Sequence, residues 1–130
     1  MNVKKLKSPS INRHTKFLLS ISIPMNDIFS KEHCATLASE GKLYVLKVLR
    51  NGGAEWDAQT CVMAAKNNHL ELLQWARSDN CPWNADVCET AVTNGHLEIF
   101  QWAYVNGCAV TEETKKKAKE QWPNVFGNDK

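Results

Sequence analysis

A block of 27 residues occurs twice in succession in this chain, without a gap. The block at 56–82 reads WDAQTCVMAAKNNHLELLQWARSDNCP, and the block at 83–109 reads WNADVCETAVTNGHLEIFQWAYVNGCA. Twelve of the 27 positions are identical, and exchanges such as Leu72 for Ile99 keep the apolar character. A short fixed period is typical of chains that copy one supersecondary unit along an axis, each copy burying its apolar side against its neighbours.

Each unit is predicted to contain two helices joined by a tight turn. In the block at 83–109, Asn84 is a good N-cap for a helix from Ala85 to about Asn94. Gly95 supplies the left-handed backbone that ends a helix, and a second helix follows over 97–105. Apolar residues recur on one face of the first helix at the i, i+3, i+4 spacing of buried positions, namely Cys88, Ala91 and Val92.

The register of the repeat divides the chain into segments. It extends backward to a weaker copy at 29–55 and forward to a C-terminal cap at 110–122, in which Thr111 caps a helix. One face of this last helix stays apolar and the other is polar, as expected of a terminal unit. We expect residues 1–28 to form a basic leader and a candidate N-terminal cap, and residues 123–130 to form a tail.

Charge is distributed unevenly along the chain. Residues 1–28 hold five basic side chains and one acidic one, a net charge of +4, whereas the remaining 102 residues hold 11 basic and 13 acidic ones, a net charge of −2. A basic leader before the short apolar stretch 17–25 also fits a signal or transit peptide, although we favour a terminal cap. Residues 15–23 fit a helix or a strand equally well. No segment approaches the roughly 18–20 continuous apolar residues of a membrane span.

Two motifs of the unit resemble those of ankyrin repeats. The segments AAKNNHLE at 64–71 and NGHLE at 94–98 are similar to the AA-x-x-GHLE segment that joins the paired helices of that family. NCPWN at 80–84 falls where ankyrin repeats carry G-A-D-V-N. The T-P-L-H motif is reduced to its buried apolar position, and the period is 27 residues rather than about 33. Similar shortened repeats occur in proteins of large DNA viruses and some protists.

This resemblance covers 29 to about 118 and implies a fold. It implies an all-α chain, an ankyrin-like helix-turn-helix solenoid with shortened or absent β-hairpin fingers. The missing residues fall between Ala85 and Asp86, where the family carries the finger. The resemblance also implies that the histidines at 69 and 96 help to fix the turn between helices.

The five cysteines follow the period of the repeat. Equivalent positions in stacked helical units lie roughly 8–10 Å apart, whereas a disulfide needs Cα atoms within about 7 Å. We therefore expect free thiols that pack as small apolar groups, in a reducing, intracellular compartment, the cytoplasm or alternatively the nucleus. The cysteines are Cys34, Cys61, Cys88, Cys81 and Cys108.

The five cysteines do not indicate a metal site or a catalytic site. A structural zinc site typically uses two close ligand pairs such as C-x2-C, and this chain has none. A nucleophilic cysteine needs an activating base and an exposed, electropositive environment, whereas these cysteines lie on predicted inward faces. We expect no metal, no cofactor and no enzymatic activity. Two series of tryptophans, Trp56 with Trp83 and Trp75 with Trp102, are expected to pack in the core.

Comparing the copies indicates where a partner could bind. Several positions of the first helix differ freely between copies, and the resemblance places them on the ridge that contacts protein partners. Met63 is expected to be the one exposed apolar residue there. The candidate partner-binding residues are Thr36, Ser39, Met63, Lys66, Thr90 and Thr93.

The favoured function is a non-catalytic protein-protein interaction module built from ankyrin-like repeats. We expect a monomer, no membrane span and a protein partner of unknown identity. Nucleic acid is disfavoured because acids at 112, 113 and 120 dilute the lysine cluster at 115–119, which is more typical of a solvated helix face. The alternative is a nucleic-acid or membrane-surface adaptor that uses the basic residues at 1–28.

Overall fold

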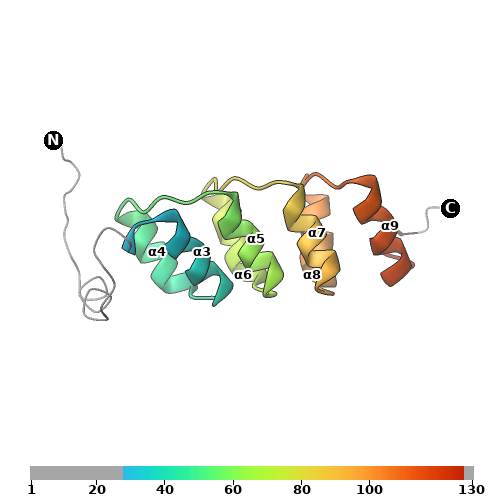
Figure 1. Cartoon of the computed structure of the whole chain (residues 1–130), viewed down its shortest axis with the longest axis horizontal. Helices are drawn as coiled ribbons and strands as arrows, with labels where there is room; N and C mark the ends of the chain where they lie inside the picture. Colours follow the sequence, from blue (N-terminus) through green and yellow to red (C-terminus); the bar gives the residue numbers. More distant parts are fainter. Residues whose placement is uncertain (1–27, 128–130) are drawn as a thin grey trace.

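The computed structural model describes residues 28–127, which form α-helices joined by turns and short connections (Figure 1). This range holds seven helices and no strand, so the prediction of an all-α chain is confirmed for the described residues. The predicted leader, apart from Ile28, lies outside the described residues, and so do the last three residues of the chain. The helices are α3 (Lys31–Ser39), α4 (Leu43–Asn51), α5 (Ala58–Lys66), α6 (Leu70–Ser78), α7 (Ala85–Thr93), α8 (Leu97–Val105) and α9 (Glu112–Gln121).

The first helix of each unit and α9 begin at polar caps that repeat every 27 residues. Asp57 and Asn84 each accept a hydrogen bond, through a side-chain oxygen, from the backbone N–H two residues further on. Ser30 and Thr111 accept from the N–H three residues further on. A side-chain oxygen at this place satisfies an N–H group that has no partner within the helix. The predicted caps Asn84 and Thr111 are therefore confirmed.

The helices end at residues with a left-handed backbone, again at the repeat period. Within each unit the turn residue has a φ of 72° at Gly41, 66° at Asn68 and 75° at Gly95. Between units, Gly53, Asn80 and Gly107 also have positive φ values. Glycine and, less readily, asparagine tolerate this conformation, which is why these two residue types alternate at the ends of helices.

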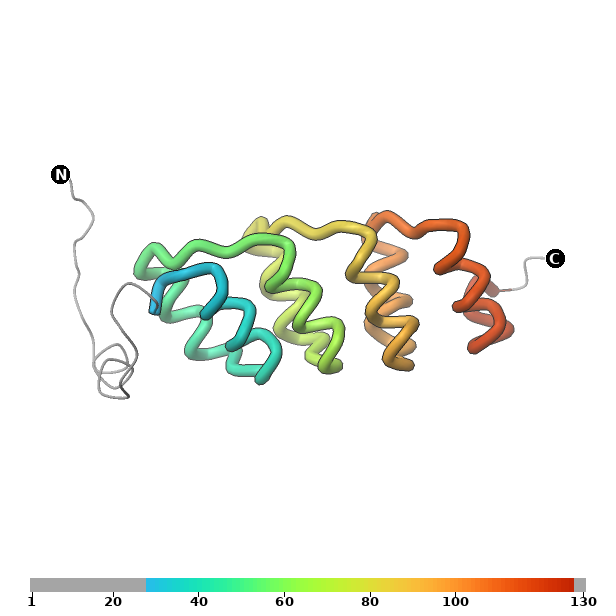
Figure 2. Tube along the Cα trace, viewed as in Figure 1, coloured from blue at the N-terminus to red at the C-terminus, as the bar shows by residue number. Residues whose placement is uncertain are grey.

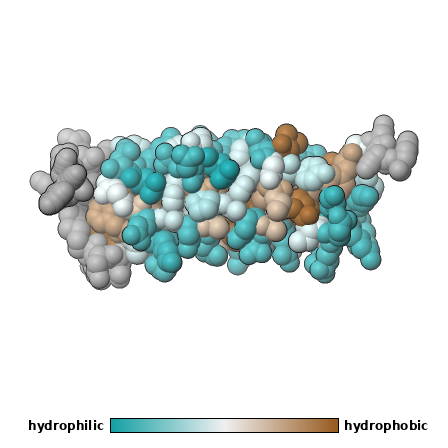
Figure 3. Space-filling model, turned by 90° about the horizontal axis from the view of Figure 1, so that it is seen from above, coloured by the Kyte–Doolittle hydropathy of each residue, from teal (hydrophilic) through white to brown (hydrophobic). Residues whose placement is uncertain are grey.

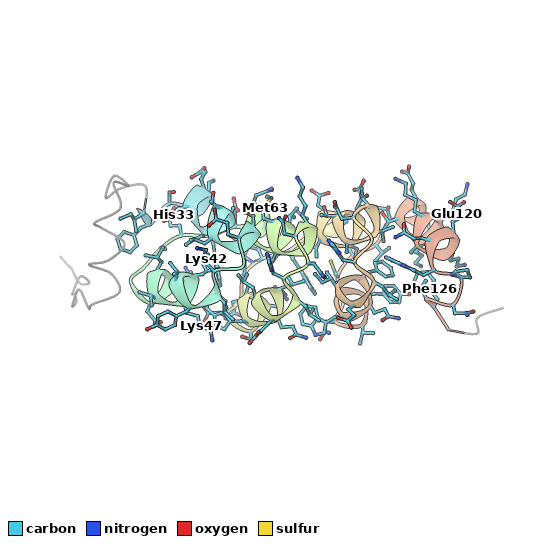
Figure 4. All side chains as sticks on the ribbon, turned by 90° about the horizontal axis from the view of Figure 1, so that it is seen from below. His33, Lys42, Lys47, Met63, Glu120 and Phe126 are labelled. Atoms are coloured by element: carbon cyan, nitrogen blue, oxygen red, sulfur yellow. The ribbon has the colours of Figure 1, made fainter. Side chains whose placement is uncertain are left out.

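The helices form two layers of an elongated row. The first helix of each unit lies in one layer, because α3 packs against α5, α5 against α7 and α7 against α9. The second helices α4, α6 and α8 lie in the other layer (Figure 4). The connections between units run along one edge of the row, and the turns within units lie along the opposite edge (Figure 2).

The core runs along the row between the two layers. Small buried residues recur where first helices meet, such as Ala38 and Ala65, and larger ones recur on the second helices, such as Leu46, Leu73 and Phe100. Small side chains let neighbouring helices approach closely. The edge that carries the connections is mostly hydrophilic, with apolar groups along the middle and one strongly apolar group at the rim (Figure 3).

At the C-terminal end, α9 has no second helix beside it within the described residues. The segment after α9 covers the apolar end of α8 instead. The ring of Phe100 lies 6.0 Å from that of Trp122 and 5.9 Å from that of Phe126, and Phe126 also packs edge-on against Tyr104. Trp122 thus closes the row, and the packing of the cap extends beyond residue 122 to Phe126.

Gly41 and Gly95 test how tightly one unit packs on the next. Their φ values are 72° and 75°, so an added side chain meets the same backbone strain at both. A Cβ at position 41 would lie 2.7 Å from Cε1 of His69, whereas at position 95 the nearest atom, Nε2 of Gln121, is 3.8 Å away. We expect Gly41→Ala to lower the free energy of unfolding in urea by about 1 kcal/mol or more beyond the loss in Gly95→Ala. Equal losses in the two variants would contradict this packing.

Candidate functional site

The six residues singled out by comparing copies all lie in the layer of first helices. Thr36 and Ser39 are on α3, Met63 and Lys66 on α5, and the remaining two on α7. The side chains of Thr36, Lys66 and Thr93 are exposed, whereas those of Ser39, Met63 and Thr90 are half-buried. Met63 was expected to be exposed. This expectation is wrong, because the side chain lies in the groove between α3 and α5 and is half-buried there.

A groove of about 360 Å³ separates α3 from α5 on this layer. It brings together three of the predicted residues, Thr36, Ser39 and Met63. Lys66, Thr90 and Thr93 do not line it. Charged residues at the helix starts, Lys31, Glu32 and Asp57, complete its walls, and sequence comparison missed them. These residues could have been found from the sequence, because they occupy the cap or the first turn of two adjacent first helices.

The hydroxyl groups of the groove donate to backbone carbonyls of their own helix. Oγ1 of Thr36 lies 3.0 Å from the carbonyl oxygen of Glu32, and Oγ of Ser39 lies 2.7 Å from that of Thr36. A hydroxyl that donates in this way still has lone pairs free to accept. The groove therefore offers hydrogen-bond acceptors to a ligand.

One ion pair spans the groove from α3 to the cap of α5. Nζ of Lys31 lies 3.8 Å from Oδ2 of Asp57, and 53% and 44% of the two side chains are exposed. An exposed pair at this distance contributes little to stability. The pair neutralises Lys31, the one lysine that lines the groove. Glu32, in contrast, forms no ion pair with any of the described residues.

The histidines join neighbouring units. Nε2 of His69 donates to the carbonyl oxygen of Ser39 over 3.1 Å, and Nε2 of His96 donates to that of Lys66 over 3.0 Å. Each acceptor is the last residue of the first helix in the preceding unit. The resemblance implied a contact that fixes the turn within a unit; the observed bond ties that turn to the unit before it.

Arginine and tryptophan form a second contact between units. The guanidinium carbon of Arg50 lies 4.1 Å from the ring centroid of Trp56, and that of Arg77 lies 4.4 Å from the ring of Trp83. A cation over an indole face is attracted by the ring electrons. The arginines also donate to turn carbonyls four residues on, at Ala54 and Cys81. Sequence reasoning missed this contact, although the arginines are 27 residues apart.

The tryptophans themselves pack edge-on in pairs. The ring centroids of Trp56 and Trp75 are 5.3 Å apart, and those of Trp83 and Trp102 are 5.7 Å apart. All four are half-buried and pack against the core, rather than lying fully within it. The two predicted series are therefore joined into pairs, each made of one residue from the connection and one from the second helix of the same unit.

All five cysteines are buried and free, as predicted. Sγ of Cys81 donates to the carbonyl oxygen of Asp57 over 3.4 Å, and Sγ of Cys108 does the same to Asn84 over 3.3 Å. A hydrogen bond between its thiol and that of Cys61 raises the pKa of Cys81, and burial raises it further. Cysteines that are not equivalent in the repeat are thus neighbours within a unit, which the comparison of equivalent positions did not consider.

Among residues 28–127, no three or more His, Cys, Asp or Glu side chains are grouped in a way that could hold a metal ion. Within the same range, every helix is too short or too polar to cross a membrane.

Comparison with protein-family models, with curated proteins and with solved structures finds no match to this chain. A function therefore has to be argued from the residues of the groove and from the contacts between units.

Buried thiols should be protected from reagents. We expect native protein at pH 7.5 to react with Ellman's reagent only on the timescale of unfolding, and the unfolded chain to release all five thiols. Rapid reaction of any cysteine in the native protein would contradict the packing described here.

The same burial makes stability depend on pH. Burial raises the pKa of the Cys34 thiol from 9.0 to about 11, so its protonated form is favoured in the folded state. Its contribution to stability is fully present below pH 9 and is lost as the pH rises toward 11. In urea unfolding, Cys34→Ala should therefore show a weaker decline in unfolding free energy across this range than the parent chain.

Proposed function

We propose that this chain is a non-catalytic protein-protein interaction module built from ankyrin-like repeats. The paired helices, the left-handed turn residues and the two-layered row support a helix-turn-helix solenoid without β-hairpin fingers. The resemblance in the GHLE segments supports the assignment to ankyrin-like repeats. A monomer, an intracellular location in the cytoplasm or nucleus, and a partner of unknown identity stay predictions.

The proposal is supported by a contrast between the side chains that recur at the repeat period and those that differ between copies. Side chains that recur at the repeat period are engaged in the scaffold: His69 and His96 bind backbone carbonyls, and Arg77 stacks on Trp83. Side chains that differ between copies lie on the surface of the first-helix layer, where they are free to contact a partner. A rigid scaffold with a variable surface suits recognition rather than catalysis.

The alternative, a nucleic-acid or membrane-surface adaptor, depends on the basic residues at 1–28. All of those basic residues lie outside the described part of the chain, so this alternative stays a prediction. The basic helix α9 gives it little support, because Glu112, Glu113 and Glu120 flank its lysines, and Lys115 lies 3.8 Å from Glu112.

Two substitutions on the first-helix layer test the proposal. Met63→Asp combined with Thr90→Asp places charge on the surface that differs between copies, so we expect it to weaken the capture of partners identified by proximity labelling. The matched control is Gln74→Asp combined with Gln101→Asp, which adds the same charge at exposed, equivalent positions of α6 and α8. The melting temperature should change no more in the test variant than in the control.

Two results would count against the proposal. In one, the control weakens capture as much as the test variant does. In the other, capture is lost only because the test variant unfolds.

A further inference from the structure

We propose that the groove between α3 and α5 binds a basic segment of a protein partner, with one unbranched apolar side chain of that segment against Met63. This inference rests on the proposed function, and it names the chemistry of the partner.

The apolar wall of the groove is formed by Met63 and the buried Ala35. Figure 4 places Met63 on the layer formed by the first helices, opposite to Lys47 on the second-helix layer. A methionine side chain is unbranched and polarisable, so it adapts to the shape of an apolar group laid against it. Because Met63 is only half-buried, a partner side chain can cover the part that faces solvent.

The charges of the groove favour a cation. Lys31 is paired with Asp57, which leaves the carboxylate of Glu32 as the unpaired charge among the lining residues. The surrounding layer has the same sign. Along α3, α5, α7 and their flanking cap residues there are two basic and five acidic side chains, a net charge of −3, namely Lys31, Lys66, Glu32, Glu40, Asp57, Asp86 and Glu89. Such a field attracts basic segments and is screened by salt.

The same charges disfavour other occupants. Nucleic acid and anionic membranes would be repelled by a surface of net charge −3. A second copy of this layer would carry like charge against like charge. The chain's own residues 1–28 have a net charge of +4 and share the required chemistry, so they are tested as a competing occupant.

The probe is a phage-displayed library of random 12-residue peptides, selected on the full chain. We expect the selected peptides to contain an excess of Lys and Arg and one Met. Binding of synthetic versions is then measured by fluorescence anisotropy. Glu32→Lys should weaken binding by about fivefold or more, because an attraction becomes a repulsion, and added salt should weaken binding to the parent chain. Met63→Ala should weaken it by about tenfold through loss of apolar contact, with no change of charge in the groove.

Matched controls lie on the opposite layer. Glu71→Lys on α6 makes the same change of charge as Glu32→Lys, and Gln74→Ala introduces the same side chain as Met63→Ala, both at exposed positions. We expect binding to the control variants to equal that of the parent chain.

The other outcomes separate this inference from the proposed function. Selection of neutral or acidic peptides whose binding is weakened by Met63→Ala would contradict a basic partner, but it would agree with the proposed interaction module. Peptides affected only by Glu71→Lys would overturn both. A library that yields no binder would overturn the inference, while partner capture tests the module independently. A synthetic peptide of residues 1–28 is tested in the same way. If it binds the groove with the same dependence on Glu32 and no library peptide does, then the occupant is a segment of this chain, and the inference is overturned.

Discussion

The stacking of Arg77 on Trp83 joins the second helix of one unit to the connection that begins the next. A pair of nine-residue helices has too little apolar surface to enclose a core alone, so each unit depends on groups that its neighbour supplies. The arginine contributes a cation over the indole face, and in the other direction His96 donates to the backbone of the unit before it. Because these contacts recur at the same positions, one geometry propagates along the row.

This dependence separates two kinds of position. Residues that carry the contacts between units are constrained by partners on both sides, and they are the ones that repeat. Positions such as Thr36 and Met63 face the surface of the first-helix layer and differ from copy to copy. The groove arises because two neighbouring first helices meet over small side chains, which leaves space above them. Its acidic character comes from side chains at helix starts, where carboxylates also favour the positive end of the helix dipole.

Local features of the fold could be predicted from the sequence. The helix expected from Ala85 to about Asn94 is observed as Ala85–Thr93, because a capping side chain and a left-handed turn residue act within a few residues of the chain. Contacts between segments could not be predicted in the same way. The half-burial of Met63 depends on how closely α3 approaches α5. The proximity of the free thiols of Cys61 and Cys81, which share a hydrogen bond, depends on how a unit folds back on itself. The period placed these residues on faces but gave no distances between them.

The dependence of one unit on the next is tested most directly by a double-mutant cycle between Arg77 and Trp83. The free energy of unfolding in urea, followed by circular dichroism, is measured for the parent chain, for Arg77→Met, for Trp83→Leu and for the double variant. The stacked geometry predicts that the two losses are not additive, with a coupling of about 0.5–2 kcal/mol in favour of the pair. Strict additivity of the two losses would contradict the claim that this contact holds neighbouring units together.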